Sequence, residues 1–187
     1  MPLLLSSVTV VMITGSLSLT KIVAAQDQYT HGLPHWYIFT PWGCAGFVMY
    51  AIASTAETNR SPFDLPEGES ELVAGYHTEY SGFKFALFFL GEYLAMFSIS
   101  GLGTTLFLGG WSAPLAALNW VPSWIWFFSK LMLAIFVFIW LRRTLPRLRQ
   151  DQLMNFAWKF VLPICLLNLF VAGAWQLMGK SCLFIHI

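Results

Sequence analysis

The sequence predicts an all-α integral membrane protein with about five transmembrane helices. Of its 187 residues, 57% are hydrophobic and only 10% are charged, whereas soluble domains carry roughly 25% charged residues. Five apolar segments are each long enough, at about 20 residues, for a helix to cross a hydrocarbon core of roughly 30 Å. The strands of a membrane barrel would alternate polar and apolar residues, but "LMLAIFVFIWL" at 131–141 is apolar on every face. A helical bundle follows.

The five predicted helices form a single domain over residues 1–187. The first is predicted to stay in the mature chain, because "MPLLLSSVTVVMITGSLSLTK" lacks the positive region of a signal peptide, and Pro2 lies at or just before its first turn. The glycines of "GLGTTLFLGG" (101–110) follow no strand, so they indicate a helix break or close packing instead of a dinucleotide site. The predicted helices cover 3–24, 37–56, 83–107, 122–142 and 156–178, with an acidic loop at 57–82 and a basic loop at 143–155.

Basic residues indicate how the bundle sits in the membrane, because loops on the inner side carry an excess of Lys and Arg. If the loop at 143–155 is inside, only Lys21 and Lys180 flank the outer helix ends. The inner ends then hold seven basic residues, Arg60, Lys84, Arg142, Arg143, Arg147, Arg149 and Lys159. The acidic loop is therefore predicted on the cytoplasmic side, or on the matrix side in an organelle, and the C-terminus on the opposite side.

Composition excludes several classes of site. A net charge of +1 provides no basic field for nucleic acid. Cys44, Cys165 and Cys182 are far apart and form no pair suited to zinc or an iron–sulfur cluster. His31 and His35 have the i, i+4 interval of a metal pair, but the glycine and proline within "HGLPH" oppose the helix that this interval needs. No cofactor or metal is predicted on this chain.

One short stretch, "ETNRSPFDLPEGESELVAGYHTEYSGF" at 57–83, gathers most of the acids of the chain. Between residues 57 and 92, Arg60 and Lys84 are the only Lys or Arg residues. Seven of the nine acids lie in this interval: Glu57, Asp64, Glu67, Glu69, Glu71, Glu79 and Glu92. Carboxylates held close together in a poorly solvated place repel one another and can exchange protons near neutral pH. The pattern therefore predicts a proton relay.

Taken singly, some of these acids have a simpler interpretation as solvated helix caps. "SPFD" (61–64) and "PEGE" (66–69) resemble helix starts, with proline in the first turn and acids at the positive end of the dipole. Acids that are exposed to solvent need no neighbouring aromatic residues, however. The cluster is interleaved with Phe63, Tyr76, His77 and Tyr80. His77 could titrate in the same range. The cluster as a whole therefore favours the relay.

Two ionisable residues are predicted deep in the membrane. Glu92 lies about 13 Å into its helix from Phe83, and Lys130 lies about 12 Å into its own from Pro122. Ionisable groups at such depth are costly and by default functional. The alternative is a structural pair that bridges two helices, and in both interpretations the two side chains face the interior of the bundle.

Two long blocks resemble the signatures of one family. "AETNRSPFDLPEGESELVAGYHTEYSGFKFALFFLGEY" (56–93) and "LPRLRQDQLMNFAWKFVLP" (145–163) are similar to the quinone-site membrane subunit of respiratory complex I, the proton-pumping NADH:quinone oxidoreductase (subunit 1 in mitochondria, the H subunit in bacteria). The helices between the blocks match in order and length. The resemblance covers nearly the whole chain and corresponds to the C-terminal part of the family.

The resemblance implies that the acidic loop helps to build the chamber where quinone is reduced. It matches Glu57, Asp64, Glu67, Glu69, Glu71, Glu79 and Glu92 to carboxylates of a relay, to which the depth of Lys130 adds a further candidate. It also matches Arg60, Arg142, Arg147 and Arg149 to basic residues of the same cytoplasmic face. The residues predicted to line the chamber are Arg60, Phe63, Asp64, His77, Arg142, Arg147 and Arg149. Iron–sulfur clusters, FMN and NADH belong to partner subunits, which comprise the peripheral-arm and quinone-site subunits and the antiporter-like membrane subunits. The implied location is the bacterial plasma membrane or, alternatively, the mitochondrial inner membrane.

The chain also departs from the family pattern. Members are longer, and their first helices, an amphipathic helix at the quinone entrance and a helix with further glutamates have no counterpart here. We therefore expect either an alternative start or a second chain that supplies the N-terminal half. Gln150 stands where the family pattern has tyrosine, and Arg143 where it has a small residue.

Three other functions remain open at this point. A subunit of an energy-conserving membrane hydrogenase, or of another donor:quinone complex, would share the fold, although the intact "SPFDLPE" favours quinone. A secondary transporter could line an ion path with Glu92 and Lys130, but it would usually show paired halves. A purely structural anchor would leave the deep charges unexplained.

Overall fold

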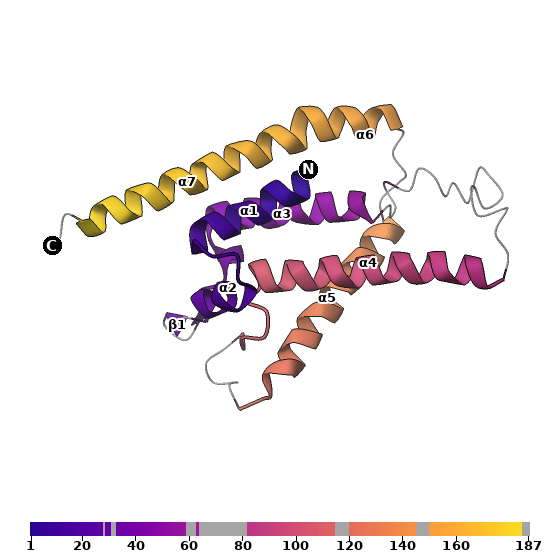
Figure 1. Cartoon of the computed structure of the whole chain (residues 1–187), viewed down its shortest axis with the longest axis horizontal. Helices are drawn as coiled ribbons and strands as arrows, with labels where there is room; N and C mark the ends of the chain where they lie inside the picture. The colour runs from indigo at the N-terminus through magenta and orange to yellow at the C-terminus, as the bar shows by residue number, and fades with distance from the viewer. Residues whose placement is uncertain are drawn as a thin grey trace.

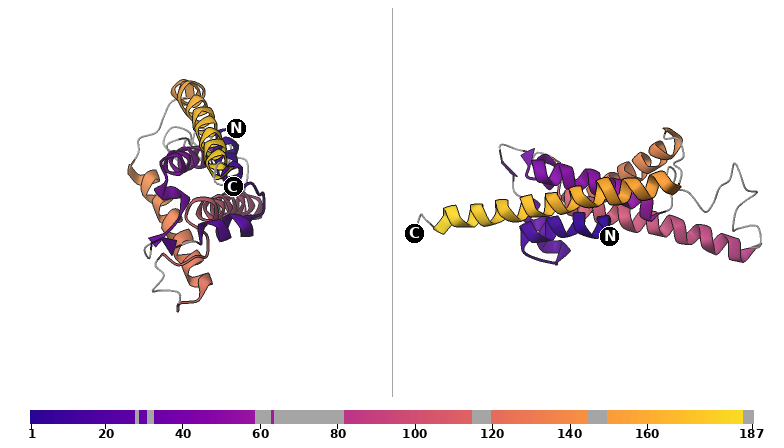
Figure 2. Two further views of the ribbon diagram at one scale, coloured as in Figure 1. Left: turned by 90° about the vertical axis from the view of Figure 1, so that its left-hand side faces the viewer. Right: turned by 90° about the horizontal axis from the view of Figure 1, so that it is seen from above.

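The computed structural model describes residues 1–27, 29–30, 33–58, 63, 82–114, 120–144 and 150–184. Its described helices form an elongated bundle in which α1, α3 and α7 lie side by side (Figures 1 and 2). The helical elements are α1 (Pro2–Thr14), α2 (Leu19–Gln26), the 3₁₀ turn η1 (Tyr37–Phe39), α3 (Pro41–Glu57), α4 (Phe83–Phe107), α5 (Ser123–Thr144), α6 (Gln150–Phe156), the π-helical turn η4 (Ala157–Val161) and α7 (Leu162–Phe184). Between α2 and η1 the two-residue strands β1 (Tyr29–Thr30) and β2 (Leu33–Pro34) pair antiparallel.

The described part of the chain is helical apart from the short β1–β2 pair, which agrees with the predicted helical class at the coarse level. Among the described residues, three helices are long and apolar enough to cross a bilayer: Phe83–Phe107, Ser123–Thr144 and Gln152–Met178, of 25, 22 and 27 residues. A fourth span exists if α1 and α2 together count as one. Within the described residues, length and composition therefore support three or four spans, and the predicted total of about five stays a prediction.

The first predicted helix, 3–24, is wrong as a single element. It is divided into α1 and α2, whose axes differ by 66°. Gly15 ends α1 in the left-handed conformation, φ 65°, and its N–H donates to the carbonyl of Val11. Ser18 then adopts extended backbone and begins α2. A left-handed glycine after the last turn is a common way to end a helix.

The second helix begins later than predicted: the prediction was 37–56, and α3 covers Pro41–Glu57. Thr40 interrupts it with extended backbone, and its hydroxyl accepts a hydrogen bond from the N–H of Gly43 at 3.2 Å. Pro41 then occupies the first turn of α3, where its missing N–H costs nothing. The 17 residues of α3 reach about 26 Å, somewhat less than a hydrocarbon core of roughly 30 Å.

The predicted basic loop, 143–155, is mostly helical where it is described. Helix α5 continues to Thr144, and α6 begins at Gln150, before the predicted start at 156. The helix α6 runs through η4 into α7 as one long rod (Figure 1).

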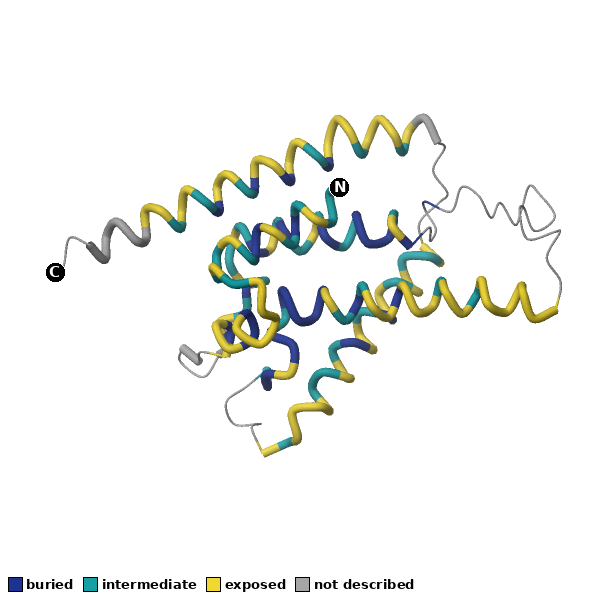
Figure 3. The backbone as a smooth tube through the Cα atoms, viewed as in Figure 1, coloured by how far each residue is buried: buried dark blue, intermediate teal, exposed yellow. Residues whose placement is uncertain are grey.

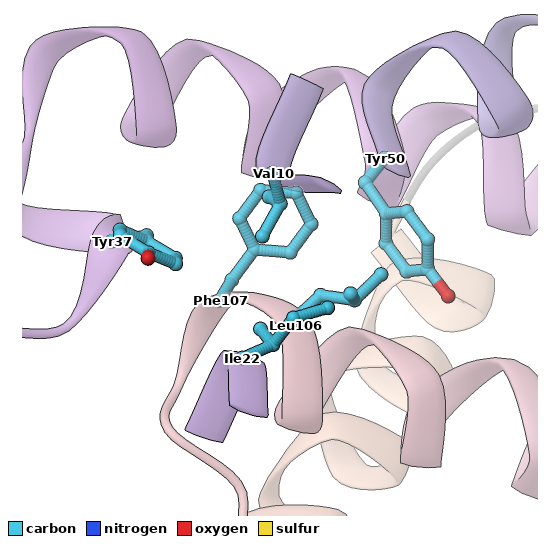
Figure 4. Close-up of a cluster of buried hydrophobic side chains, with 6 residues drawn as sticks. All are labelled: Val10, Ile22, Tyr37, Tyr50, Leu106 and Phe107. Carbon is cyan, nitrogen blue, oxygen red and sulfur yellow. The ribbon is translucent and has the colours of Figure 1, made fainter. Parts of the chain in front are cut away.

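The buried core lies where α1, α2, η1, α3 and α4 meet. It consists of Val10, Ile22, Tyr37, Tyr50, Leu106 and Phe107 (Figure 4). Hydrogen bonds also join helices of the bundle: the Tyr50 hydroxyl donates to the carbonyl of Ile99 at 2.8 Å, and the Gln176 amide donates to that of Ile13 at 2.9 Å. Most residues of α4's first half, α5 and α7 are exposed (Figure 3), as expected of surfaces that face lipid or further helices.

Candidate functional site

The structure describes five of the residues predicted to carry function: Glu57, Phe63, Glu92, Lys130 and Arg142. The others lie outside the described residues, namely Arg60, Asp64, Glu67, Glu69, Glu71, His77, Glu79, Arg147 and Arg149. The site is therefore built from the helices that lead to and from the acidic stretch.

Four helix ends gather at one end of the bundle, which we call the acidic end. Helix α3 ends there at Glu57, α4 begins at Phe83, α5 ends at Thr144 and α6 begins at Gln150 (Figure 1, right). The acidic stretch and the second signature block therefore depart from the same end. The described residues Glu57, Lys84 and Arg142 bring charges of both signs to this end.

Glu57 is exposed in the last turn of α3, where a negative charge faces the negative end of the helix dipole. Its carboxylate is not what caps the helix. That role falls to the buried Thr58, whose hydroxyl donates to the carbonyl of Ser54 at 2.9 Å. Phe63, the one residue between 59 and 81 that the structure describes, is buried, with 7% of its surface exposed.

Glu92 lies on the one face of α4 that turns toward the bundle. Buried residues of α4 recur at Met96, Ser100, Gly103 and Phe107, the spacing of one helical stripe. Glu92 precedes Met96 by four residues and is half-buried, while its neighbours Gly91 and Tyr93 are exposed. The stripe therefore continues from the core to Glu92 and on toward the acidic end.

Lys130 of α5 binds backbone carbonyls and not Glu92, the partner in the structural pair considered above. Its ammonium donates to the carbonyls of Leu108 at 2.7 Å, Gly110 at 3.0 Å and Ser112 at 2.7 Å. We call this arrangement the carbonyl clamp. Three carbonyl acceptors match in number the three donors of a lysine ammonium. Glu92 lies 16 residues before Leu108, about 24 Å away along α4, so the two deep charges are not a pair.

The carbonyl clamp closes the end of α4 opposite to the acidic end. The Lys130 ammonium lies 4.2 Å from the ring centroid of Trp36, a favourable cation–π position. The indole N–H of Trp36 donates to the Ser112 hydroxyl at 3.1 Å, and Asp27 adds an attractive charge. A cation at a helix C-terminus also complements the dipole. The clamp thus joins Trp36, which precedes η1, to α5 and to the residues that follow α4.

A second buried polar residue, Gln26, supports the same junction. It is 0% exposed. Its amide nitrogen lies 3.0 Å from the carbonyl of Leu106, to which it donates, and its amide oxygen accepts from the N–H of Tyr37 at 3.4 Å. Sequence reasoning missed both Gln26 and the clamp. The available signal was Gly109-Gly110, a pair just beyond a helix end and able to adopt positive φ, here 69° and 51°.

Replacing Gly109 by alanine should destabilise the protein more than the same change at Gly15. Both residues have positive φ, 69° and 65°, so both variants bear the left-handed cost of roughly 1–2 kcal/mol. A Cβ at Gly109 would also lie 2.5 Å from the Ser112 hydroxyl and 2.7 Å from the Trp36 indole nitrogen, whereas a Cβ at Gly15 would meet nothing within 4 Å. We expect a further loss of about 1–3 kcal/mol for Gly109→Ala. Thermal denaturation in detergent compares the two; equal losses would contradict the tight packing of the clamp.

Comparison with known proteins shows which family and which relatives the chain is similar to. The family model described as NADH dehydrogenase matches residues 1–173. The chain is 51% identical over 172 residues to the H subunit of NADH-quinone oxidoreductase from Bacillus cytotoxicus and 52% identical to that from Bacillus mycoides (strain KBAB4). Each alignment covers 92% of this chain and 49% of the relative. The chain therefore spans about half the length of the curated relatives it matches.

Proposed function

The chain belongs to the NADH dehydrogenase family, and we propose that it serves as a membrane subunit of a proton-translocating NADH:quinone oxidoreductase. In this proposal it forms one wall of the chamber where quinone is reduced and carries carboxylates that couple this reduction to proton transfer. A further polypeptide segment completes the chamber, because the aligned relatives are about twice as long. Iron–sulfur clusters, FMN and NADH are assigned to partner subunits, and quinone to the interface with them.

The observation that best supports the proposal is the position of Glu92. It extends the buried stripe of α4 toward the acidic end, while the remaining surface of that half of the helix is exposed. An ionisable group on the inward face of a membrane helix marks a pathway for charge more often than a surface feature. Glu92 is therefore the proposed link between the acidic stretch and the interior of the membrane.

The proposed chemistry follows from the charge balance of quinone reduction. Two electrons and two protons convert a quinone to a quinol. Protons drawn from nearby acids leave carboxylates charged in a poorly solvated place, and their mutual repulsion favours proton uptake by the next group. The proposed sequence runs from the chamber acids Asp64, Glu67, Glu69 and Glu71, through Glu79, to Glu92. Glu57 is proposed to belong to the same relay.

Basic residues at the acidic end are proposed to balance this charge. Arg142, in the last turn of α5, is half-buried at that end. Arg60, Arg147 and Arg149, with Phe63 and His77, are proposed to line the chamber. Lys130 does not enter the proposed relay, because its ammonium is held by the three carbonyls of the clamp at the opposite end.

The assembly itself can be tested by purifying the protein from its native membrane in mild detergent and identifying the chains that accompany it. The proposal expects NADH-dehydrogenase and iron–sulfur subunits, together with antiporter-like membrane subunits. Nickel–iron hydrogenase subunits would instead assign the chain to an energy-conserving hydrogenase, and the absence of any companion chain would contradict the proposal.

Glu79→Gln should slow proton pumping in the assembled complex. The substitution keeps the shape of the side chain but removes its ability to carry a proton, and a well-placed general acid or base contributes about 10²–10⁴-fold. NADH-driven quinone reduction and acidification by membrane vesicles measure the effect. Glu79→Asp is the matched control and should retain part of the rate. Wild-type rates in both variants would remove Glu79 from the relay.

A further inference from the structure

The helix α1 covers only half of the rod that α6, η4 and α7 form. The two run parallel (Figure 1): the Cys165 thiol donates to the carbonyl of Pro2 at 3.9 Å, and the Gln176 amide donates to that of Ile13 at 2.9 Å. Cys165 is the middle residue of the membrane span Gln152–Met178. The half of this span nearer the acidic end therefore extends beyond α1.

The side of the rod that α1 covers continues toward the acidic end as an apolar surface. Where α1 lies beside it, Cys165 and Ala172 are each 1% exposed. Nearer the acidic end, Trp158 and Met154 are 65% and 53% exposed. Positions 154, 158, 165, 172 and 176 follow one another at intervals of four and seven residues, the spacing of one helical face. We call the surface at Met154 and Trp158 the open face.

The first turn of α1, which lies at the end of the open face, has donors that a lipid does not satisfy. A hydrogen bond runs from the N–H of Leu5 to the carbonyl of Met1, and the N–H groups of Leu3 and Leu4 have no acceptor within the helix. The contact with Cys165 places this turn at the middle of the span, where lipid tails offer no acceptor. The carbonyl groups of a polypeptide would satisfy these donors.

The length of the family indicates which polypeptide this is. Each aligned relative is matched by this chain over 49% of its own length. We call the unmatched half the complementary segment. A segment that crosses the membrane beside this chain does so as an apolar helix, and such a helix ends in carbonyl groups without an intrahelical donor. These are the acceptors that the first turn of α1 lacks.

We propose that a transmembrane helix of the complementary segment docks on the open face, against Met154 and Trp158. Its last carbonyls accept hydrogen bonds from the N–H groups of Leu3 and Leu4. The rod from Gln152 to Cys165 is about 20 Å long, so about 13 residues of the docked helix lie beside it. This inference rests on the proposed function in one respect, the need for a further segment to complete the chamber.

Site-specific photo-crosslinking tests the docking. The photoreactive amino acid p-benzoylphenylalanine replaces Trp158 in the full protein, native membranes are irradiated, and crosslinked peptides are identified by mass spectrometry. We expect a crosslink to a peptide similar in sequence to the unmatched half of the H subunit. The matched control has the same amino acid in place of Phe170, which is 74% exposed but lies two residues from Ala172 and so on another face. The control should not give this crosslink.

Trp158→Ala provides a second variant. The chain carries an affinity tag, and the complementary segment that copurifies in mild detergent is quantified. Loss of the indole should weaken its retention by about tenfold, equivalent to about 1.4 kcal/mol of binding. Phe170→Ala is the control and should retain the segment as the wild type does. Both side chains are exposed, so neither change should disturb the fold of the chain itself.

Crosslinks from position 158 to lipid alone, to a second copy of this chain or to a peptide unlike the H subunit would overturn the docking. Equal retention of the complementary segment by Trp158→Ala and Phe170→Ala would do the same. Neither outcome decides the relay, which is measured by the rates of the Glu79 and Glu92 variants. Conversely, wild-type rates in those variants would remove the relay and leave a crosslink at position 158 in place.

Discussion

Replacing Lys130 by methionine should lower the free energy of unfolding by about 3 kcal/mol, because it removes the donor that satisfies three backbone carbonyls at once. Methionine retains much of the length and apolar stem of lysine, so the change isolates the ammonium. The carbonyls of Leu108, Gly110 and Ser112 then lose their partner at the end of α4. The cation–π contact with Trp36 is lost as well.

The measurement is thermal denaturation in detergent at a fixed heating rate, since membrane proteins often unfold irreversibly. Lys84→Met is the matched control, because it removes the same charge from an exposed position in the first turn of α4. We expect the control to change stability by less than about 0.5 kcal/mol. Equal effects of the two substitutions would show that the carbonyl clamp contributes nothing specific.

Glu92→Gln should reduce coupled quinone reduction in the assembled complex by about 10²-fold, the lower range for the loss of a proton-transfer group. Glutamine has the size and polarity of glutamate, so packing along the stripe of α4 is preserved. Glu92→Asp keeps a titratable carboxyl group one methylene shorter and should retain more activity. The rate of NADH oxidation with added quinone provides the readout, and native gel electrophoresis verifies assembly.

A merely structural Glu92 would behave differently. Its replacement would lower the amount of assembled complex but leave the rate per complex and its pH dependence unchanged. In the relay proposal, the pH profile of the Glu92→Asp complex differs from that of the wild type, because the new carboxyl group exchanges protons from a different position. Full activity of assembled Glu92→Gln complex would remove this residue from the relay.

Apolar length was enough to predict the central helices. The predicted 83–107 coincides with α4, and 122–142 lies within two residues of α5, because long apolar runs in lipid must satisfy their backbone as helices. The break in the first predicted helix was missed because a single glycine such as Gly15 is tolerated within many helices. Whether Gly15 adopts the left-handed conformation that ends α1 depends on where α2 packs. The start of α3 had a readable signal in Thr40-Pro41, a cap residue followed by proline.

The deep charges show a different limit of sequence reasoning. Hydropathy predicts that Glu92 and Lys130 lie at depth, but it does not choose their partners. The partners of Lys130 are backbone carbonyls, which every residue has and which carry no side-chain signature. The stripe that contains Glu92 could be assigned to the inward face only once Met96, Ser100 and Phe107 were seen to be buried.

The most direct test of the proposed coupling is a cryo-electron microscopy map of the intact complex with a quinone analogue bound. The relay proposal predicts that residues 57–82 form a wall of the analogue's chamber, next to an iron–sulfur subunit. It also predicts a continuous line of protonatable groups and water from that wall to Glu92. A map in which the same segment faces bulk water, far from both the analogue and any electron carrier, would contradict it.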